Sequence, residues 1–202
     1  VLIGALRATL TRRLEELDLF ELYQQIELPL CSVLAEMERE GVLVDRGALV
    51  QFGEMLSERI GQVQARIYAL AGEDTFNINS TQQLGQILFE RLGLPPVKKT
   101  KTGWSTNAEV LEKLRGQHPI IEEILEYRQL TKLKSTYADG LGTVIAPDGR
   151  IHTSFQNTVT ATGRLSSTEP NLQNIPVHRE FHFIAAEIQR VHPLRVVLVG
   201  GA

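Results

Sequence analysis

Cysteine is almost absent from this chain of 202 residues, since only Cys31 is present. A single cysteine cannot form an internal disulfide, so a disulfide-stapled secreted scaffold is excluded. Apolar runs of the roughly 18 residues that a membrane span needs are also missing. Neither the 8 prolines nor the 16 glycines form a collagen-like or proline-rich repeat. With 43% hydrophobic and 22% charged residues, the composition is typical of a globular protein with a buried core.

Sequence motifs for catalysis are missing as well. The histidines have no metal-ligand spacing to cysteine or carboxylate residues. No phosphate-binding loop, dinucleotide-binding glycine motif or nucleophile-elbow serine is present. We therefore predict no catalytic residues and no metal ligands in this chain.

Charge is distributed unevenly along the chain, although the formal net charge is only −3. Residues 1–90 carry 7 basic and 14 acidic side chains, whereas residues 91–136 carry 9 basic and 5 acidic ones. A basic middle in an acidic chain is typical of a surface that binds a polyanion. A block of this size also arises by chance, so charge alone leaves both interpretations open.

Helical periodicity dominates the first 140 residues. Leucines between Leu6 and Leu17 recur at steps of three and four, which predicts an amphipathic helix. Asp45 is placed to cap a later helix, and Ser80 and Thr106 are each followed by Gln or Glu at capping-box spacing. The expected helices cover residues 6–17, 22–40, 46–72, 80–92, 106–115 and 119–137.

The pattern changes after residue 140. Residues 147–149 (Pro-Asp-Gly) predict a turn, and the alternating, β-branched run 151–160 predicts a strand. Residues 42–44 predict a short extended piece, and residues 94–103, with two prolines and three lysines, predict a loop. The expected fold is mainly α with a small antiparallel β element after residue 140, and α+β overall.

One face of the last predicted helix is suited to binding a phosphate backbone. Arg128 and Lys132 are four residues apart and share that face, which Ser135 or Thr136 continues. Cations and hydroxyls one turn apart can follow a row of phosphates. The loop before the preceding helix adds three further cations, Lys98, Lys99 and Lys101. The alternative interpretation is an ordinary solvated surface.

Residues 158–176 form a polar, turn-rich stretch of a different kind. The stretch combines one arginine with asparagine, glutamine and several hydroxyl side chains, and it has few apolar residues. Such donors can reach the acceptors that every base pair presents in the minor groove. On physical grounds alone, the stretch is either a binding segment or a plain polar loop.

The same stretch carries a resemblance to a known family. Residues 161–167 (ATGRLSS) and 170–176 (PNLQNIP) resemble the first signature of family A DNA polymerases, the bacterial DNA polymerase I group. Residues 127–137 (YRQLTKLKSTY) resemble the long thumb helix of that family, and residues 105–107 resemble the tip of the thumb. The resemblance covers roughly residues 5–180, in the family's order.

The resemblance implies a domain organisation. Residues 1–27 would be the end of the exonuclease-like domain, residues 28–140 the helical thumb, and residues 141–176 the start of the palm. Residues 177–202 do not resemble the family, and we expect them to be a tail that is foreign to it.

The resemblance also implies contacts with a primer-template duplex. Arg164 matches the arginine that reaches the minor groove at the primer end. Three further residues match family residues that make polar contacts with the primer-template near the active site: Asn171, Gln173 and Asn174. Contacts with the duplex backbone are expected from the thumb helix and, with a looser match, from the thumb tip: Arg128, Lys132, Lys134, Ser135, Thr136, Lys98, Lys99 and Lys101.

The sequence departs from the family after Pro176. The family continues to two metal-binding aspartates and to the fingers that bind the incoming nucleotide, but no aspartate follows Asp148 here. Phosphoryl transfer by two metal ions needs carboxylates that hold both ions. The resemblance therefore implies Mg²⁺ as the cofactor of the intact family enzyme, and we expect no cofactor in this chain.

We therefore expect a DNA-binding fragment of a template-directed DNA polymerase of replication or repair, inactive on its own. The expected partner is a DNA primer-template duplex. We expect a monomer without membrane association, located with the nucleoid in the bacterial cytoplasm. The alternative is a non-catalytic helical module that binds nucleic acid or another protein.

Overall fold

The computed structural model describes residues 2–100 and 103–175. The described residues form two compact units: residues 2–44 with 144–175, named here the split unit, and residues 45–143, named the central unit. The central unit is mainly helical, the split unit is helical over residues 2–16 and 20–40, and every sheet in the described part is a two-stranded antiparallel pair. The predicted fold class is confirmed.

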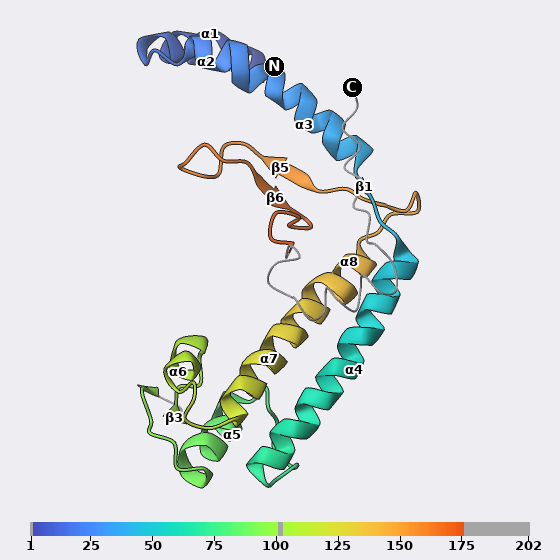
Figure 1. Ribbon diagram of the computed structural model, residues 1–202. Helices are drawn as coiled ribbons and strands as arrows, with labels where there is room; N and C mark the ends of the chain where they lie inside the picture. Colours follow the sequence, from blue (N-terminus) through green and yellow to red (C-terminus); the bar gives the residue numbers. More distant parts are fainter. Residues whose placement is uncertain (1, 101–102, 176–202) are drawn as a thin grey trace. The chain divides into compact units, whose positions relative to one another are not determined.

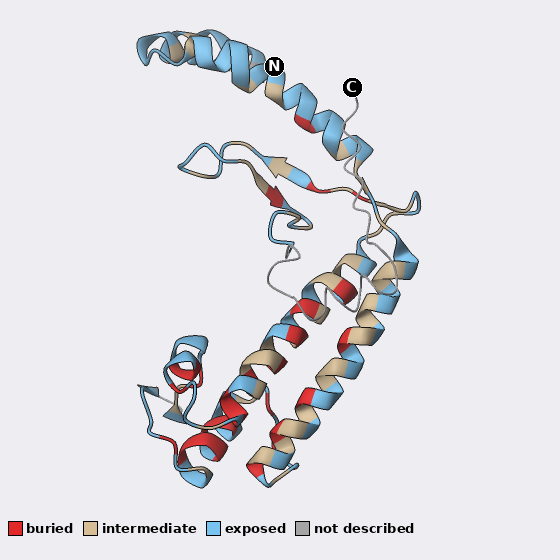
Figure 2. Cartoon of the chain, in the orientation of Figure 1, coloured by how far each residue is buried: buried red, intermediate tan, exposed pale blue. Residues whose placement is uncertain are grey.

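The central unit is built on two long antiparallel helices, α4 (Arg46–Ala71) and α7 (Ile120–Leu133), which pack side by side (Figure 1). Burial of each large apolar side chain stabilises such a pair by about 1.5–3 kcal/mol. The side chains buried along these helices include Leu56, Val63, Ile67, Ile120, Ile121, Ile124 and Leu130. Figure 2 shows that buried positions recur along both helices.

The ends of α4 follow the sequence signals. Asp45 caps the first turn, since its Oδ1 accepts a hydrogen bond from the Ala48 N–H at 2.9 Å. The helix ends at Gly72, whose φ of 64° is left-handed. Halfway along, Arg59 and Arg66 of α4 form ion pairs with Glu126 and Glu123 of α7 at 2.7 and 2.9 Å.

The helix that begins with α7 is longer than expected. It continues without a break through η3 (Lys134–Asp139) and α8 (Gly140–Thr143), beyond the predicted end near residue 137. Gly140 does not stop the helix. A Cβ atom there would lie 3.0 Å from the Ser135 carbonyl oxygen, so the glycine allows the wide turn of η3 to pass close to it.

The tip of the central unit contains α5 (Thr81–Gly85), η2 (Gln86–Arg91) and a small ribbon. Ser80 caps α5 as predicted, with the Gln83 N–H donating to its Oγ at 3.4 Å. The segment predicted as a plain loop contains two strands, β2 (Lys99–Thr100) and β3 (Gly103–Trp104). These strands lack an apolar period, which is why the sequence did not reveal them.

The start of α6 (Ala108–Lys113) corrects one prediction. The capping residue is Asn107, whose Oδ1 accepts from the Val110 N–H at 3.0 Å, and not Thr106. Thr106 is only 1% exposed, and its hydroxyl and carbonyl oxygens both accept hydrogen bonds from Arg128. The two neighbours are both good capping residues, and the tertiary contact with Arg128 selects between them.

The split unit begins with helices that match the predicted ranges. They are α1 (Leu2–Glu16), α2 (Phe20–Leu22), η1 (Tyr23–Glu27) and α3 (Leu28–Glu40). The apolar stripe of α1 is not buried in the described part of the chain, since Leu6 and Leu10 are 52% and 56% exposed, and Leu17, just after the helix, is 49% exposed. Figure 2 shows that exposed positions predominate along this run of helices.

The predicted strand over residues 151–160 is correct only in part. It is divided into β4 (Arg150–Ile151) and β5 (Ser154–Gln156), which belong to different sheets. β4 pairs with β1 (Val42–Leu43), whereas β5 pairs with β6 (Ser166–Thr168) inside the polar stretch. The predicted turn at residues 147–149 is present, closed by a 2.8 Å hydrogen bond from the Ala146 N–H to the Arg150 carbonyl oxygen.

Hydropathy along the described helices shows whether any of them could span a membrane. In this part of the chain, every helix is too short or too polar to cross a lipid bilayer.

The assignment of Asn107 gives a test of local stability. Asn107→Ala should lower the free energy of unfolding by about 1 kcal/mol, because the Val110 N–H loses its acceptor. Urea denaturation followed by circular dichroism measures this change. Asn107→Ser keeps a capping oxygen and should cost only a few tenths of that amount. Equal stability of the Ala and Ser variants would contradict the assignment.

Candidate nucleic-acid interface

The polar stretch of the split unit is organised by two buried hydroxyl groups, those of Thr153 and Ser167, which we name the hydroxyl pair. Their oxygens are 2.8 Å apart, and the two residues are 6% and 0% exposed. The Ser167 hydroxyl accepts from the Leu172 N–H at 3.0 Å, and both hydroxyls lie within hydrogen-bond distance of the Pro170 carbonyl oxygen. Because buried polar atoms need partners, these contacts determine the course of the chain after β6.

Gln173, predicted to contact DNA, is directed back toward its own segment. Its Nε2 donates to the Leu165 carbonyl oxygen at 2.6 Å, and its Oε1 accepts from the Ser167 N–H at 3.3 Å. The neighbouring Asn171 is exposed, and its Oδ1 accepts from the Gln173 N–H at 3.0 Å. Asn174 is exposed as well. Gln173 therefore closes the segment 165–173 on itself.

Arg164 lies in the connection between β5 and β6, and its side chain is exposed. Its carbonyl oxygen accepts from the Thr160 hydroxyl at 2.5 Å. Gly163, with a φ of 73°, donates its N–H to the Thr160 carbonyl oxygen at 3.3 Å. This tight turn directly precedes the segment organised by the hydroxyl pair, so Arg164 is an exposed cation on an ordered support.

Arg128, in the central unit, has protein partners. Its Nη1 donates to the carbonyl oxygen of Thr106, and its Nη2 donates to the hydroxyl of Thr106 at 3.2 Å. Partial burial lowers the pKa of Arg128, although a guanidinium stays charged at neutral pH. Arg128 thus anchors the loop before α6 to α7.

The remaining predicted residues of this helix differ in their surroundings. Lys132, Ser135 and Thr136 are exposed. The Ser135 hydroxyl donates to the Lys132 carbonyl oxygen at 3.2 Å, a contact within the helix. The ammonium group of Lys134 lies 2.8 Å from a carboxylate oxygen of Asp139, so this cation is paired.

Two of the three lysines that were predicted at the tip of the thumb, Lys98 and Lys99, lie at the start of the ribbon β2–β3. The Lys99 ammonium group is 5.6 Å from the centre of the Trp104 ring, a cation–π distance, and Trp104 packs edge-on against Phe89. Lys98 is exposed. Its charge contributes, after the hydrogen bond and charge of Lys113, to lowering the pKa of Glu109 on α6. Lys101 lies outside the described residues.

The predicted DNA-binding residues thus divide into two groups, one in each unit. The sequence did not reveal three residues that support them, Thr106, Thr153 and Ser167, because nothing in a run of hydroxyl residues indicates which ones become buried. Only the family signature, which includes Ser167, contained such an indication.

Comparison with known proteins decides the family of the chain. The family model described as DNA polymerase family A matches residues 46–192. The chain belongs to this family. The matched range extends beyond residue 176, into the segment expected to be foreign to the family, and the domain boundaries stay predictions.

The relatives are bacterial DNA polymerases. DNA polymerase I of Bacillus subtilis strain 168 is 52% identical over 179 residues, which cover 88% of this chain and 20% of the relative. The thermostable DNA polymerase I of Thermus aquaticus is 54% identical over 174 residues, or 84% of this chain and 21% of the relative. The chain therefore spans about a fifth of the length of these relatives.

A solved structure extends the comparison to three dimensions. The POL domain of Pol1 from M. smegmatis, solved in complex with a DNA primer-template and dNTP, matches with a TM-score of 0.73 at 44% identity. The match covers 85% of this chain and 30% of that chain. The chain is thus similar to part of a polymerase domain.

The described residues of this chain do not fit the magnesium ions that the family implies. In the part of the chain that the structure describes, no three His, Cys, Asp or Glu residues lie close enough together to hold a metal ion. No aspartate follows Asp148 in the sequence. We therefore derive no chemical step through a metal ion bound to this chain.

The hydroxyl pair gives a testable consequence. Ser167→Ala should lower the free energy of unfolding by about 1–3 kcal/mol, because the Leu172 N–H loses a buried acceptor. Amide exchange at Leu172 should quicken in parallel. Ser166→Ala, which removes a neighbouring hydroxyl outside the pair, is the control and should change both readouts little. If Ser167→Ala behaves like this control, the pair does not organise the segment.

Proposed function

We propose that this chain is the part of a family A DNA polymerase that grips the primer-template duplex and checks its minor groove. The observation that carries the proposal is Arg164, an exposed cation beside a segment whose backbone is tied down by Ser167 and Gln173. An arginine held in this way can donate to the acceptors common to all base pairs. The complex of the similar M. smegmatis domain with a primer-template supports the proposal.

We propose two roles within the predicted set of residues. The exposed side chains of Lys98, Lys132, Ser135, Thr136, Arg164, Asn171 and Asn174 contact the duplex. The side chains engaged within the protein shape the surface that carries them: Arg128 through Thr106, Gln173 through Leu165 and Ser167, and Lys134 through Asp139. At the tip, Lys99, which lies over the Trp104 ring, contacts the duplex together with Lys101.

The intact polymerase would use this part as follows. Residues 1–27 would end the exonuclease-like domain, residues 28–140 would form the thumb, and residues 141–176 would begin the palm, while the family match continues to residue 192. Nucleotide transfer with Mg²⁺ needs the metal-binding aspartates of the family, and no aspartate follows Asp148 in this chain. The chain supplies DNA binding, and the rest of a complete enzyme supplies the chemistry.

A second candidate function is a helical module that binds another protein. One observation favours it: the apolar stripes of α1 and α3 are exposed, with Leu6, Leu10, Val33 and Met37 each at least half exposed. DNA binding that depends on Lys132 and Arg164 distinguishes the first proposal from the second.

Binding to a primer-template duplex should weaken as salt rises. Each phosphate neutralised on B-DNA contributes about −0.9 to the slope of log K against log salt concentration, so three or four contacts give roughly −3. Lys132→Ala should make this slope shallower by about 0.9, because one cation is lost. Fluorescence anisotropy at several salt concentrations measures the slope.

The control for Lys132→Ala is Arg12→Ala on α1. It removes the same charge from an exposed cation that pairs with Glu16, outside the proposed interface. The slope should stay unchanged in this variant. Absence of binding at low salt, or binding that ignores salt, would refute the proposed grip.

Nucleotide incorporation by the chain alone should be absent. Primer extension with Mg²⁺ and all four deoxynucleotides should give no product above background, because the chain does not contain the metal-binding aspartates of the family. A preparation of the same chain with Arg164→Ala serves as the background for contaminating host polymerase. Extension that disappears in this variant would show that the chain is itself active.

A further inference from the structure

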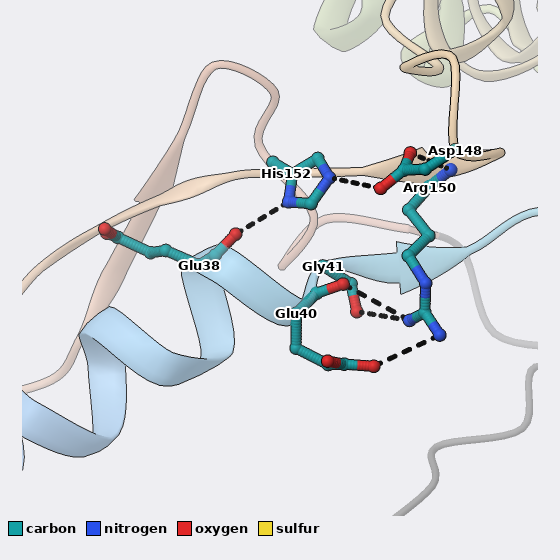
Figure 3. A network of polar contacts seen from close by, with 6 residues as sticks. All are labelled: Glu38, Glu40, Gly41, Asp148, Arg150 and His152. Atoms are coloured by element: carbon teal, nitrogen blue, oxygen red, sulfur yellow. Dashed lines mark hydrogen bonds and ion pairs between the residues drawn. The ribbon is translucent and has the colours of Figure 1, made fainter.

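A polar network joins the end of α3 to the turn and strand that follow residue 147 (Figure 3). Glu38, Glu40 and Gly41 provide groups from α3 and its cap, and Asp148, Arg150 and His152 provide groups from the other side. All six residues belong to the split unit. The proposed DNA contacts do not include any of them.

His152 lies at the centre of this network, between two acceptors. Its Nδ1 is 2.7 Å from the carbonyl oxygen of Glu38, and its Nε2 is 3.1 Å from the Asp148 carboxylate. A carbonyl oxygen and an ionised carboxylate can only accept hydrogen bonds. A neutral imidazole has one N–H and can donate to one of them, whereas an imidazolium donates to both. Both ring nitrogens therefore donate a hydrogen bond only when His152 is protonated.

The surrounding charges favour the same state. The hydrogen bond to the Glu38 carbonyl oxygen is the largest effect that raises the pKa of His152, followed by that to Asp148, while desolvation and then the charge of Arg150 oppose them. The Asp148 carboxylate has a lowered pKa, mainly through the Arg150 N–H, and stays ionised at neutral pH. On the α3 side, the Glu40 carboxylate pairs with Arg150 at 3.1 Å. The Glu38 carboxylate accepts from the Phe155 N–H at 2.6 Å.

The backbone leaves little room for movement at this point. Gly41 has a φ of 65°, and a Cβ atom there would lie 2.7 Å from the Nδ1 of His152 and 2.9 Å from the Ile151 carbonyl oxygen. The ring is thus packed against the helix cap. A side chain at position 41 would displace it.

Glu38 links His152 to the segment that carries Arg164. Its carbonyl oxygen contacts His152, and its carboxylate holds the N–H of Phe155 in β5. Phe155 pairs with Ser167 of β6 in the β5–β6 sheet. Ser167 in turn organises residues 165–173. The hydrogen bonds of Glu38 and the pairing of β5 with β6 therefore connect α3 to the polar stretch.

We propose that protonated His152 is a positioning residue for DNA binding, which clamps the β4–β5 chain to the end of α3 and thereby sets the place of Arg164. This inference rests on the proposed function, because it assigns a purpose to the position of Arg164. The clamp is complete below the ordinary His pKa of 6.5 and is lost as the pH rises through the raised pKa of the folded chain. Duplex affinity should fall over the same range.

The first measurement uses the full chain without DNA. The His152 ring is titrated by NMR, and amide exchange at Phe155 is followed over the same pH range and corrected for intrinsic exchange. The midpoint for His152 should lie above 6.5, and protection of Phe155 should fall with it. Asp148→Asn should lower the midpoint. A midpoint at or below 6.5, or protection of Phe155 that does not follow the titration, would overturn the clamp.

The second measurement is duplex affinity at constant salt between pH 6 and pH 8.5. We expect a decrease of about threefold, the factor that results when the binding-competent arrangement falls to about a third of the molecules. His152→Gln should remove this decrease, whereas His118→Gln should keep it. His118 is the matched control, a histidine of the central unit whose Nδ1 lies 3.2 Å from the Ile120 N–H. Circular dichroism verifies that each variant is folded.

The two measurements separate the possible failures. A pH dependence of affinity that survives in His152→Gln would overturn the positioning role while leaving the proposed DNA grip intact. A complete clamp in the NMR titration with no duplex binding at any pH would overturn the proposed function, and with it the purpose assigned to His152.

Discussion

Backbone groups that leave water must find partners, and in the irregular segment after β6 those partners are mainly side chains. Regular helices and strands pair such groups by repetition, but residues 165–173 include only the three-residue strand β6. Ser167, Thr153 and Gln173 supply the missing acceptors and donors. An exposed cation can be held in a defined position on irregular backbone only because this pairing is complete.

In the central unit, a charged side chain supplies the hydrogen-bond donors that irregular backbone needs. The loop before α6 has no strand partner at Thr106, and the guanidinium of Arg128 provides two donors in a fixed geometry. Hydrogen bonds to charged groups contribute about 1.5–3 kcal/mol, roughly twice the value for neutral pairs. The cost of partly burying the guanidinium is visible in its lowered pKa. An arginine that the sequence predicts to contact DNA can therefore instead stabilise the protein framework.

Local signals and tertiary contacts explain what the sequence could and could not predict. Asp45, Ser80 and Gly41 act within one turn of chain, and their roles as caps were predictable. The choice of Asn107 over Thr106 depends on Arg128, 22 residues away in the chain. The division of the strand after Ile151 depends on α3, more than 100 residues away in the sequence. The Gln173 side chain points back to its own segment, where the Ser167 hydroxyl is buried. Residue type does not indicate which hydroxyl groups become buried.

The pairing of β1 with β4 has a consequence for how the chain connects the central unit to the split unit. Leu43 lies opposite Arg150, and the Val44 N–H donates to the Gly149 carbonyl oxygen at 3.1 Å, so the chain leaves the split unit and returns to it at one place. The whole central unit is thus an insertion whose two ends are joined by a single ladder. Insertions of this kind can be exchanged without rerouting the host. A short linker in place of residues 45–143 would close the split unit, and the helical unit could be lengthened, replaced or transplanted as a cassette.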